Sequence, residues 1–238
     1  MRATIRKKET VAERTDYVEF ETEQAVDFVP GQYFFVTLDP SNEMHKDDLT
    51  HHISIVNSPS QKNTLALTTR MRVDRSLFKR TLADAKIGDE VEIGKISGSF
   101  VLPEETDKPI VLIALGIGIT PYISMLRYCD ETRKPYKFWL FYSDGDAENM
   151  PFLDELKGYD EKHAPNFKLV EIHTQDDSWE GEKGHIDAEM LKKYLKDDFD
   201  ESIFYVSGPP RPVEEVGNSI KSAGINEEKI KLDDFSGY

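Results

Sequence analysis

The chain has 238 residues, of which 38% are hydrophobic and 32% are charged, and its formal net charge is -15. This composition predicts a soluble globular protein of one or two domains, and the acidic balance argues against binding to nucleic acid or to anionic membranes. The longest apolar run, residues 110–119, contains two glycines and is too short to span a bilayer. The single cysteine, Cys129, excludes an intrachain disulfide and a metal–thiolate cluster, and the start of the chain carries no secretory signal. We therefore expect a cytoplasmic protein.

The first half of the chain is built from short apolar segments that alternate with turn residues. This spacing predicts an antiparallel sheet or barrel. The predicted strands are 17–20, 33–38, 53–56, 64–71, 90–93 and 100–102. One helix is predicted over 76–85, with Ser76 at its start and Gly88 just beyond its end. We expect the polar loop 39–50 to be mobile.

The composition changes after a short charged segment, residues 103–109, that contains two prolines. Such a segment is typical of a domain boundary, so we predict domains at 1–104 and 105–238. Beyond it, apolar runs of strand length alternate with helical patterns. The predicted strands are 110–115, 137–142, 168–173 and 203–206, and the predicted helices are 122–129, 151–156, 188–195 and 213–223. This alternation predicts a parallel, doubly wound α/β sheet.

Two glycine turns follow predicted strands of the second domain. In the first turn, Gly116 and Gly118 precede Thr120, which is suited to cap the next helix, and Pro121, which fits its first turn. Such a turn presents backbone N–H groups to a phosphate. The second turn contains Gly208 and Pro209, and two turns at the carboxyl ends of parallel strands line one crevice. The alternatives are glycines that serve packing in the first turn and an ordinary loop in the second.

A group of basic residues stands out in this acidic chain. Its members are Arg70, Arg72, Arg75, Lys79 and Arg80. The stretch 70–80 contains only one acidic residue, Asp74. Five positive charges in so short a stretch indicate an anion site. We predict no metal site: the pair His51 and His52 is adjacent on a strand, so the two imidazoles point to opposite faces.

Taken together, the motifs resemble the ferredoxin-NADP reductase superfamily over nearly the whole chain. The matching segments are 30–33 (PGQY), 51–54 (HHIS), 72–79, 88–91 (GDEV), 98–100 (GSF), 116–121 (GIGITP), 207–210 (SGPP) and 235–238 (FSGY). Their order and spacing are specific, although no single motif is. The resemblance implies a six-stranded antiparallel Greek-key β-barrel that binds FAD, followed by a doubly wound parallel α/β domain that binds NAD(P).

The sequence departs from the superfamily pattern at three positions. His51 stands where relatives have an arginine that contacts the flavin pyrophosphate, and Ile53 stands where they have a tyrosine on the isoalloxazine. Ser207 replaces the usual cysteine beside the nicotinamide, which leaves hydride transfer feasible because that step needs no cysteine nucleophile. FMN therefore remains an alternative to FAD as the bound flavin. The groups suited to replace the missing positive charge and hold the phosphates are Arg70, Arg72, Ser76 and Lys79.

The resemblance also implies roles for individual residues. Ser54 is expected to hydrogen-bond near the flavin N5, and Tyr238, or failing that Phe235, to cover the flavin face until nicotinamide displaces it. Gly208 and Pro209 are expected to bound the nicotinamide. The turn after the second strand of the α/β domain has Asp144 and no basic residue between 138 and 156, which favours NADH, with NADPH as the alternative.

We therefore interpret the sequence as a flavin-dependent NAD(P)H oxidoreductase that passes electrons to a separate acceptor. The acceptor is either a protein, such as a ferredoxin, a flavodoxin or an oxygenase component, or a small oxidant. No nucleic-acid or membrane partner is expected, and the oligomeric state stays open. The alternative, motivated by His51 and Ile53, is a binding or regulatory subunit of the same fold that has lost tight flavin binding.

Overall fold

The computed structural model describes residues 1–71 and 76–235, and they form two compact units. The first unit comprises Met1–Leu102 and Thr120–Thr132, and the second comprises the rest of the chain, from Pro103 to Ile119 and from Arg133 onward. The predicted domains, 1–104 and 105–238, assume that the chain crosses once between them. The contacts of this chain instead group residues 120–132 with the first unit, so the boundary after residue 104 stays a prediction.

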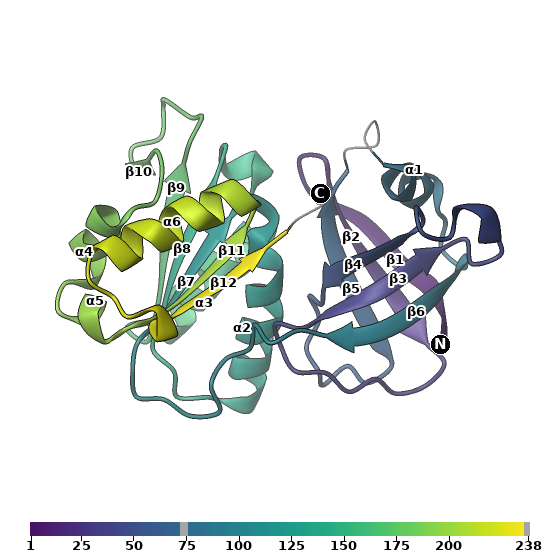
Figure 1. Ribbon diagram of the computed structural model, residues 1–238, viewed down its shortest axis with the longest axis horizontal. Helices are drawn as coiled ribbons and strands as arrows, with labels where there is room; N and C mark the ends of the chain where they lie inside the picture. The colour runs from purple at the N-terminus through teal and green to yellow at the C-terminus, as the bar shows by residue number, and fades with distance from the viewer. Residues whose placement is uncertain (72–75, 236–238) are drawn as a thin grey trace. The chain divides into compact units, whose positions relative to one another are not determined.

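The first unit is built around six antiparallel strands (Figure 1). They are β1 (Arg2–Ala12), β2 (Thr15–Thr22), β3 (Tyr33–Leu38), β4 (Thr50–Ser54), β5 (Thr64–Arg70) and β6 (Glu90–Ser97). Their order is β4-β3-β6-β1-β2-β5, and β4 and β5 at the two ends also contact each other. Because β6 returns to lie between β3 and β1, the topology is a Greek key, which confirms the predicted barrel.

In this unit the sequence pattern missed one strand and predicted one that the structure does not have. The sequence pattern missed β1, because only Ala3 and Ile5 of its eleven residues are buried and the others give no apolar alternation. Residues 100–102 are not a strand. Phe100 is buried for another reason: its ring packs against Tyr122, with the ring centroids 5.9 Å apart.

Two α-helices complete the first unit, α1 (Leu77–Asp84) and α2 (Thr120–Thr132), together with the short 3-10 helix η1 (Glu43–His45). Ser76 caps α1 as predicted, because its side chain accepts a hydrogen bond from the Lys79 N–H. Helix α2 is tied to the barrel by Ser124, whose Oγ donates to Asn57 O at 2.8 Å, and by Arg127, which donates to Val56 O at 3.2 Å. These bonds bind the helix to the segment that joins β4 to β5.

The second unit has a parallel six-stranded sheet in the order β10-β9-β8-β7-β11-β12. The strands are β7 (Ile110–Leu115), β8 (Phe138–Asp144), β9 (Phe167–His173), β10 (Glu182–Lys183), β11 (Ile203–Gly208) and β12 (Ile230–Asp234). The helices are α3 (Leu153–His163), α4 (Ala188–Leu195), α5 (Asp198–Glu201) and α6 (Pro210–Ser222), with 3-10 turns η2 (Gly116–Ile119), η3 (Ala147–Asn149) and η4 (Glu227–Lys229). Helices α4 and α6 cover one face and α3 the other (Figure 1), which confirms the doubly wound prediction.

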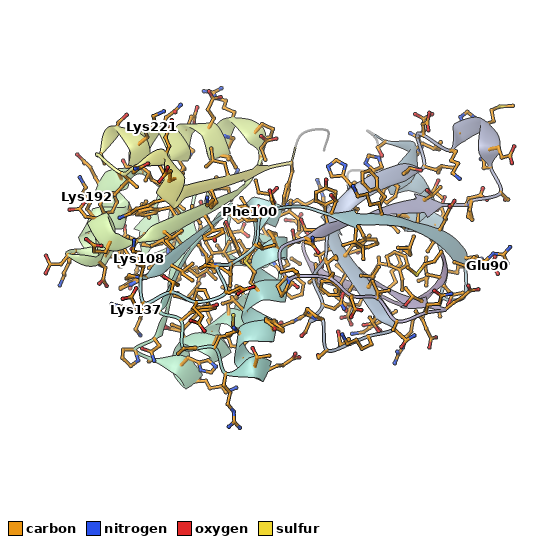
Figure 2. The ribbon with its side chains drawn as sticks, turned by 60° about the horizontal axis from the view of Figure 1, so that its bottom comes forward. Glu90, Phe100, Lys108, Lys137, Lys192 and Lys221 are labelled. Atoms are coloured by element: carbon orange, nitrogen blue, oxygen red, sulfur yellow. The ribbon has the colours of Figure 1, made fainter. Side chains whose placement is uncertain are left out.

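The edges of this sheet were not predicted. Strand β12 has no fully buried residue and β10 has only two residues, so neither gives an apolar run. The central strand β7 is buried along its whole length, which is why the sequence predicted it with its observed bounds. On the outer helices, Lys192 and Lys221 are exposed (Figure 2). In the described part of the chain, 1–71 and 76–235, no helix has the length and apolar character needed to cross a membrane.

Candidate functional site

The two glycine turns meet where the strand order of the parallel sheet reverses. Strands β7 and β11 are adjacent, and their carboxyl ends lead into Gly116 and Gly208. A Cβ on Gly118 would lie 2.0 Å from the carbonyl oxygen of Ser207, and a Cβ on Gly208 would lie 2.6 Å from that of Leu115. Neither position has room for a side chain. The structure thus brings together two turns that the sequence predicted separately, at the switch point where ligands bind in open α/β sheets.

The local geometry of the first turn differs from the prediction. Residues 116–119 form the 3-10 helix η2, and α2 follows directly, so Thr120 is the first residue of α2 and not a cap before it. Gly116 has a φ of 60°, a conformation that suits glycine. In the second turn Pro209 is the N-cap residue of α6, and Gly208 O accepts a hydrogen bond from the Phe235 N–H at 2.9 Å. The end of β12 is therefore joined to this turn.

Asp233 is a residue that sequence reasoning missed. It lies on β12 opposite Ser207, whose hydroxyl donates to Asp233 Oδ2 at 3.5 Å. Burial raises the pKa of Asp233 to about 6, and the neighbouring charge of Asp234 adds to this effect against the opposing hydrogen bond from Ser207. The only sequence signal was its place in a pair of aspartates near the end of the chain. The second glycine turn therefore adjoins a carboxyl group that titrates near neutral pH.

At the end of β8 the predicted Asp144 is turned toward its own backbone. Its Oδ1 accepts a hydrogen bond from the Gly145 N–H at 2.8 Å. Asp146 caps η3, and the side-chain amides of Asn149 and Gln175 lie within 3.6 Å of the place that a Cβ of Gly145 would take. The Gln175 N–H also donates to Gly145 O at 2.9 Å, which joins the loop after β9 to this turn. Sequence reasoning missed both amides.

In the first unit, two of the predicted phosphate-binding residues, Ser76 and Lys79, lie at the start of α1. Ser76 caps the helix, and Lys79 is buried, with Nζ donating to Thr69 Oγ1. The imidazole of His51 packs against Phe78 at 4.5 Å between ring centroids. Burial and the charge of Lys79 lower the pKa of His51, so this histidine is uncharged at neutral pH. Lys79, and not His51, therefore supplies positive charge behind this helix.

The remaining residues that were predicted to bind the flavin do not share one environment. Arg70 is half-buried at the end of β5. Ile53 is only 4% exposed and belongs to the barrel core. Ser54 points to the other face of β4, opposite Tyr33. Arg72 and Tyr238 lie outside the described residues.

Comparison with known proteins agrees with this architecture. Residues 112–217 match the family model of the oxidoreductase NAD-binding domain. The chain is 30% identical to a component of the Na+-translocating NADH-quinone reductase of Idiomarina loihiensis, over 80% of this chain and 50% of that protein. It is 24% identical to flavohemoprotein B of Dictyostelium discoideum, over 91% of this chain and 54% of the relative. The chain thus spans about half the length of these curated relatives.

Solved structures show the same fold over the whole chain. A ferredoxin-NADP+ reductase from Neisseria gonorrhoeae, with bound FAD and NADP, superposes with a TM-score of 0.81 at 18% identity. The match covers 99% of this chain and 98% of that one. The chain therefore has the fold of a ferredoxin-NADP+ reductase, and part of it matches the NAD-binding domain of oxidoreductases. The segment that matches the NAD-binding model contains both glycine turns and the end of β8.

The carboxyl of Asp233 makes the stability of this fold depend on pH. An unfolded aspartate titrates near pH 3.9, so the fold loses stability as pH rises from about 4 to about 6. We expect Asp233→Asn to raise the free energy of unfolding by roughly 2 kcal/mol at pH 7.5 and to change it little at pH 4. Urea denaturation at the two pH values measures the difference. Asp177→Asn, in the exposed loop after β9, is the control; an equal effect of Asp233→Asn at both pH values would contradict the prediction.

Proposed function

We propose that this protein is a flavin-dependent NAD(P)H oxidoreductase that takes a hydride from the nicotinamide and passes electrons to a separate acceptor. The observation that carries the proposal is the meeting of two glycine turns at the carboxyl ends of the adjacent strands β7 and β11, at the sheet switch point. Dinucleotides bind at this place in open α/β sheets. The printed names of the relatives, a component of an NADH-quinone reductase and a flavohemoprotein, support an electron-transferring role.

The first unit has features that fit a flavin nucleotide. Helix α1 begins at Leu77 with its N–H groups at its positive end, and the buried ammonium of Lys79 adds charge within the first turn. A phosphate here would be held by the N–H groups of the first turn other than that of Lys79, which already donates to the Ser76 hydroxyl, and the hydroxyl itself can still donate to the phosphate. When bound, flavin supplies the chemistry of hydride acceptance and stepwise electron release. The protein would contribute position and electrostatics.

The direct test is flavin binding followed by reduction. Purified protein is mixed with FAD, freed of unbound flavin and treated with NADH or NADPH without oxygen, and its absorbance near the flavin bands is recorded. We expect a yellow protein that bleaches with a reduced nicotinamide. A protein that binds FAD but bleaches with neither nicotinamide would overturn the proposed hydride transfer.

A second candidate function is favoured by His51 and Ile53. His51 is uncharged at neutral pH, and Ile53 packs in the barrel core, so neither makes the contact made by the arginine or tyrosine of relatives. In this alternative the chain is a binding or regulatory subunit that keeps the fold without tight flavin. Protein that stays colourless and takes up neither FAD nor FMN would select this alternative.

We also propose that NADH is preferred over NADPH. The turn after β8 carries Asp144, Asp146 and Glu148, which would repel the 2′-phosphate of NADPH. We expect Asp144→Arg with Asp146→Ser to shift the ratio of kcat/KM toward NADPH by about 10-fold or more, or 1.4 kcal/mol. Serine at 146 keeps an oxygen to cap η3. Asp154→Arg, on exposed α3, is the control, and a wild-type enzyme that already favours NADPH would contradict the proposal.

Several classes of electron acceptor are compatible with this function. A ferredoxin, a flavodoxin, an oxygenase component and a small oxidant all fit the proposed chemistry, but the net charge of -15 disfavours acidic protein partners. Location in the reducing cytoplasm stays a prediction based on cysteine usage. A turnover screen with each class of acceptor, using NADH as the donor, tests the acceptor directly.

A further inference from the structure

A buried histidine at the end of β9 lies between two carboxyl groups. The side chain of His173 is only 2% exposed. Its Nε2 lies 2.8 Å from Glu171 Oε1 on the same strand, and its Nδ1 lies 3.3 Å from Asp176 Oδ2 in the loop that follows. A carboxylate only accepts hydrogen bonds, so both contacts are made together when the ring carries a proton on each nitrogen. His173 then joins the strand to the loop by two charged hydrogen bonds.

The charges around the histidine keep both carboxyl groups ionised. Lys157 on α3 forms an ion pair with the other oxygen of Glu171, with Nζ 3.0 Å from Oε2. Hydrogen bonds from Ser178, and after them the hydrogen bond and charge of His173, lower the pKa of Asp176. Both carboxyl groups are therefore acceptors for the imidazole at neutral pH.

The loop after β9 folds back onto the histidine. The indole of Trp179 stacks on the imidazole of His173, with 4.3 Å between the ring centroids and 17° between the ring planes. A Cβ on Gly181 would lie 2.5 Å from Trp179 Nε1, so the backbone passes directly against the indole. Further along, the Gly184 N–H donates to His173 O at 3.1 Å. The loop 174–184 is therefore closed around this one residue.

The same loop holds the turn that follows β8. Asp144 O accepts hydrogen bonds from the Thr174 N–H at 2.8 Å and from Thr174 Oγ1 at 3.0 Å. Gly145 O accepts one from the Gln175 N–H at 2.9 Å. Both donor residues come directly after His173 in the chain, and Asp144 is its register partner across β8 and β9. The charged bonds of His173 therefore fix the segment that carries this turn.

We propose that His173 is a positioning residue for NADH: its two charged hydrogen bonds fix the loop after β9, and the loop places the turn with Asp144 for the adenosine ribose. The inference rests on the proposed function and on its preference for NADH. The imidazole is buried, so it acts through the loop and not by contact with the nucleotide. Without its bonds the loop would adopt several arrangements, and only those that place Asp144 correctly would bind NADH. The apparent affinity falls by that fraction.

The test uses two variants that remove the bonds in different ways. His173→Phe keeps an aromatic ring against Trp179 and removes both hydrogen bonds. Asp176→Asn removes the negative charge on the loop and keeps the shape of the side chain. We expect calorimetry to show NADH bound about 5-fold more weakly by each variant, as follows if the binding arrangement of the loop falls to roughly one fifth of the population. Hydrogen exchange at the Thr174 and Gln175 amides is expected to become faster.

Reduced nicotinamide mononucleotide separates positioning from general damage to the fold, because it lacks the adenosine half of NADH. With ferricyanide as the acceptor, we expect its kcat/KM to be unchanged in both variants, and kcat at saturating NADH to be unchanged as well. Asp177→Asn, at an exposed position of the same loop, is the matched control and is expected to change neither nucleotide's binding.

The outcomes distinguish the positioning role from the proposed function. Equal losses with both nucleotides, or an unchanged affinity for NADH in both variants, would overturn the role of His173 and leave the proposed function intact. A wild type that binds no NADH would instead remove the proposed function, and this role with it.

Discussion

Replacement of Gly118 by alanine is expected to lower the free energy of unfolding by about 3 kcal/mol or more and to abolish nicotinamide binding. The added Cβ would lie 2.0 Å from Ser207 O, 2.4 Å from Ser207 C and 2.7 Å from Gly208 N. All three atoms belong to backbone, so no side-chain rotation relieves the overlap. The two turns would have to separate. Urea denaturation gives the stability, and NADH titration at a temperature where the variant stays folded gives the affinity.

Gly158 offers a matched control for this substitution. It lies inside α3, and a Cβ there would meet nothing within 4 Å. Gly158→Ala is therefore expected to stabilise the protein by up to about 1 kcal/mol, because alanine is the better helix former. A Gly118→Ala protein as stable as the wild type, with unchanged affinity for NADH, would show that the turns do not meet as described.

Asn57→Ala is expected to lower the free energy of unfolding by about 3 kcal/mol. The side chain of Asn57 is fully buried in the segment after β4. Its Oδ1 accepts from the Ala66 N–H at 2.8 Å, and its Nδ2 donates to Thr64 O at 2.9 Å. Alanine would leave both of these backbone groups buried without a partner. The effect is measured by urea denaturation.

Asn63 gives the control for Asn57. It is exposed, and its amide donates one long hydrogen bond of 3.4 Å to Thr22 O. Asn63→Ala is expected to change stability by about 0.5 kcal/mol or less, as is usual for surface substitutions. An equal loss of unfolding free energy in the two variants would indicate that the hydrogen bonds of the Asn57 amide do not stabilise the segment between β4 and β5.

The sequence predicted the strands most accurately where their residues are buried. The strand over residues 110–115 was predicted with its observed bounds because all its residues are buried and apolar. Strands β1 and β12 were missed because they expose charged side chains and are held mainly by backbone pairing with β2 and β11. Backbone pairing is set by the neighbouring strand, and a single sequence carries little trace of it.

For the candidate site, residues in local motifs were predicted and residues from distant segments were not. Gly118 and Gly208 were recognised because each follows an apolar strand. Asp233 and Gln175 reach the same edge of the sheet only through the pairing of β12 and the loop after β9. The environment of Lys79 was also missed, because its burial against Thr69 depends on how α1 packs on the barrel.

The assignment of α2 to the first unit bears on how the barrel is completed during synthesis. The segment after β4 contacts Ser124 and Arg127, and Glu131 accepts a hydrogen bond from Ser58. These partners emerge from the ribosome only after the nascent chain has passed through β7. A barrel truncated after residue 102 would lack them, as would one on a ribosome paused there. We therefore expect the first unit to gain these contacts only once residues 120–132 have left the ribosome.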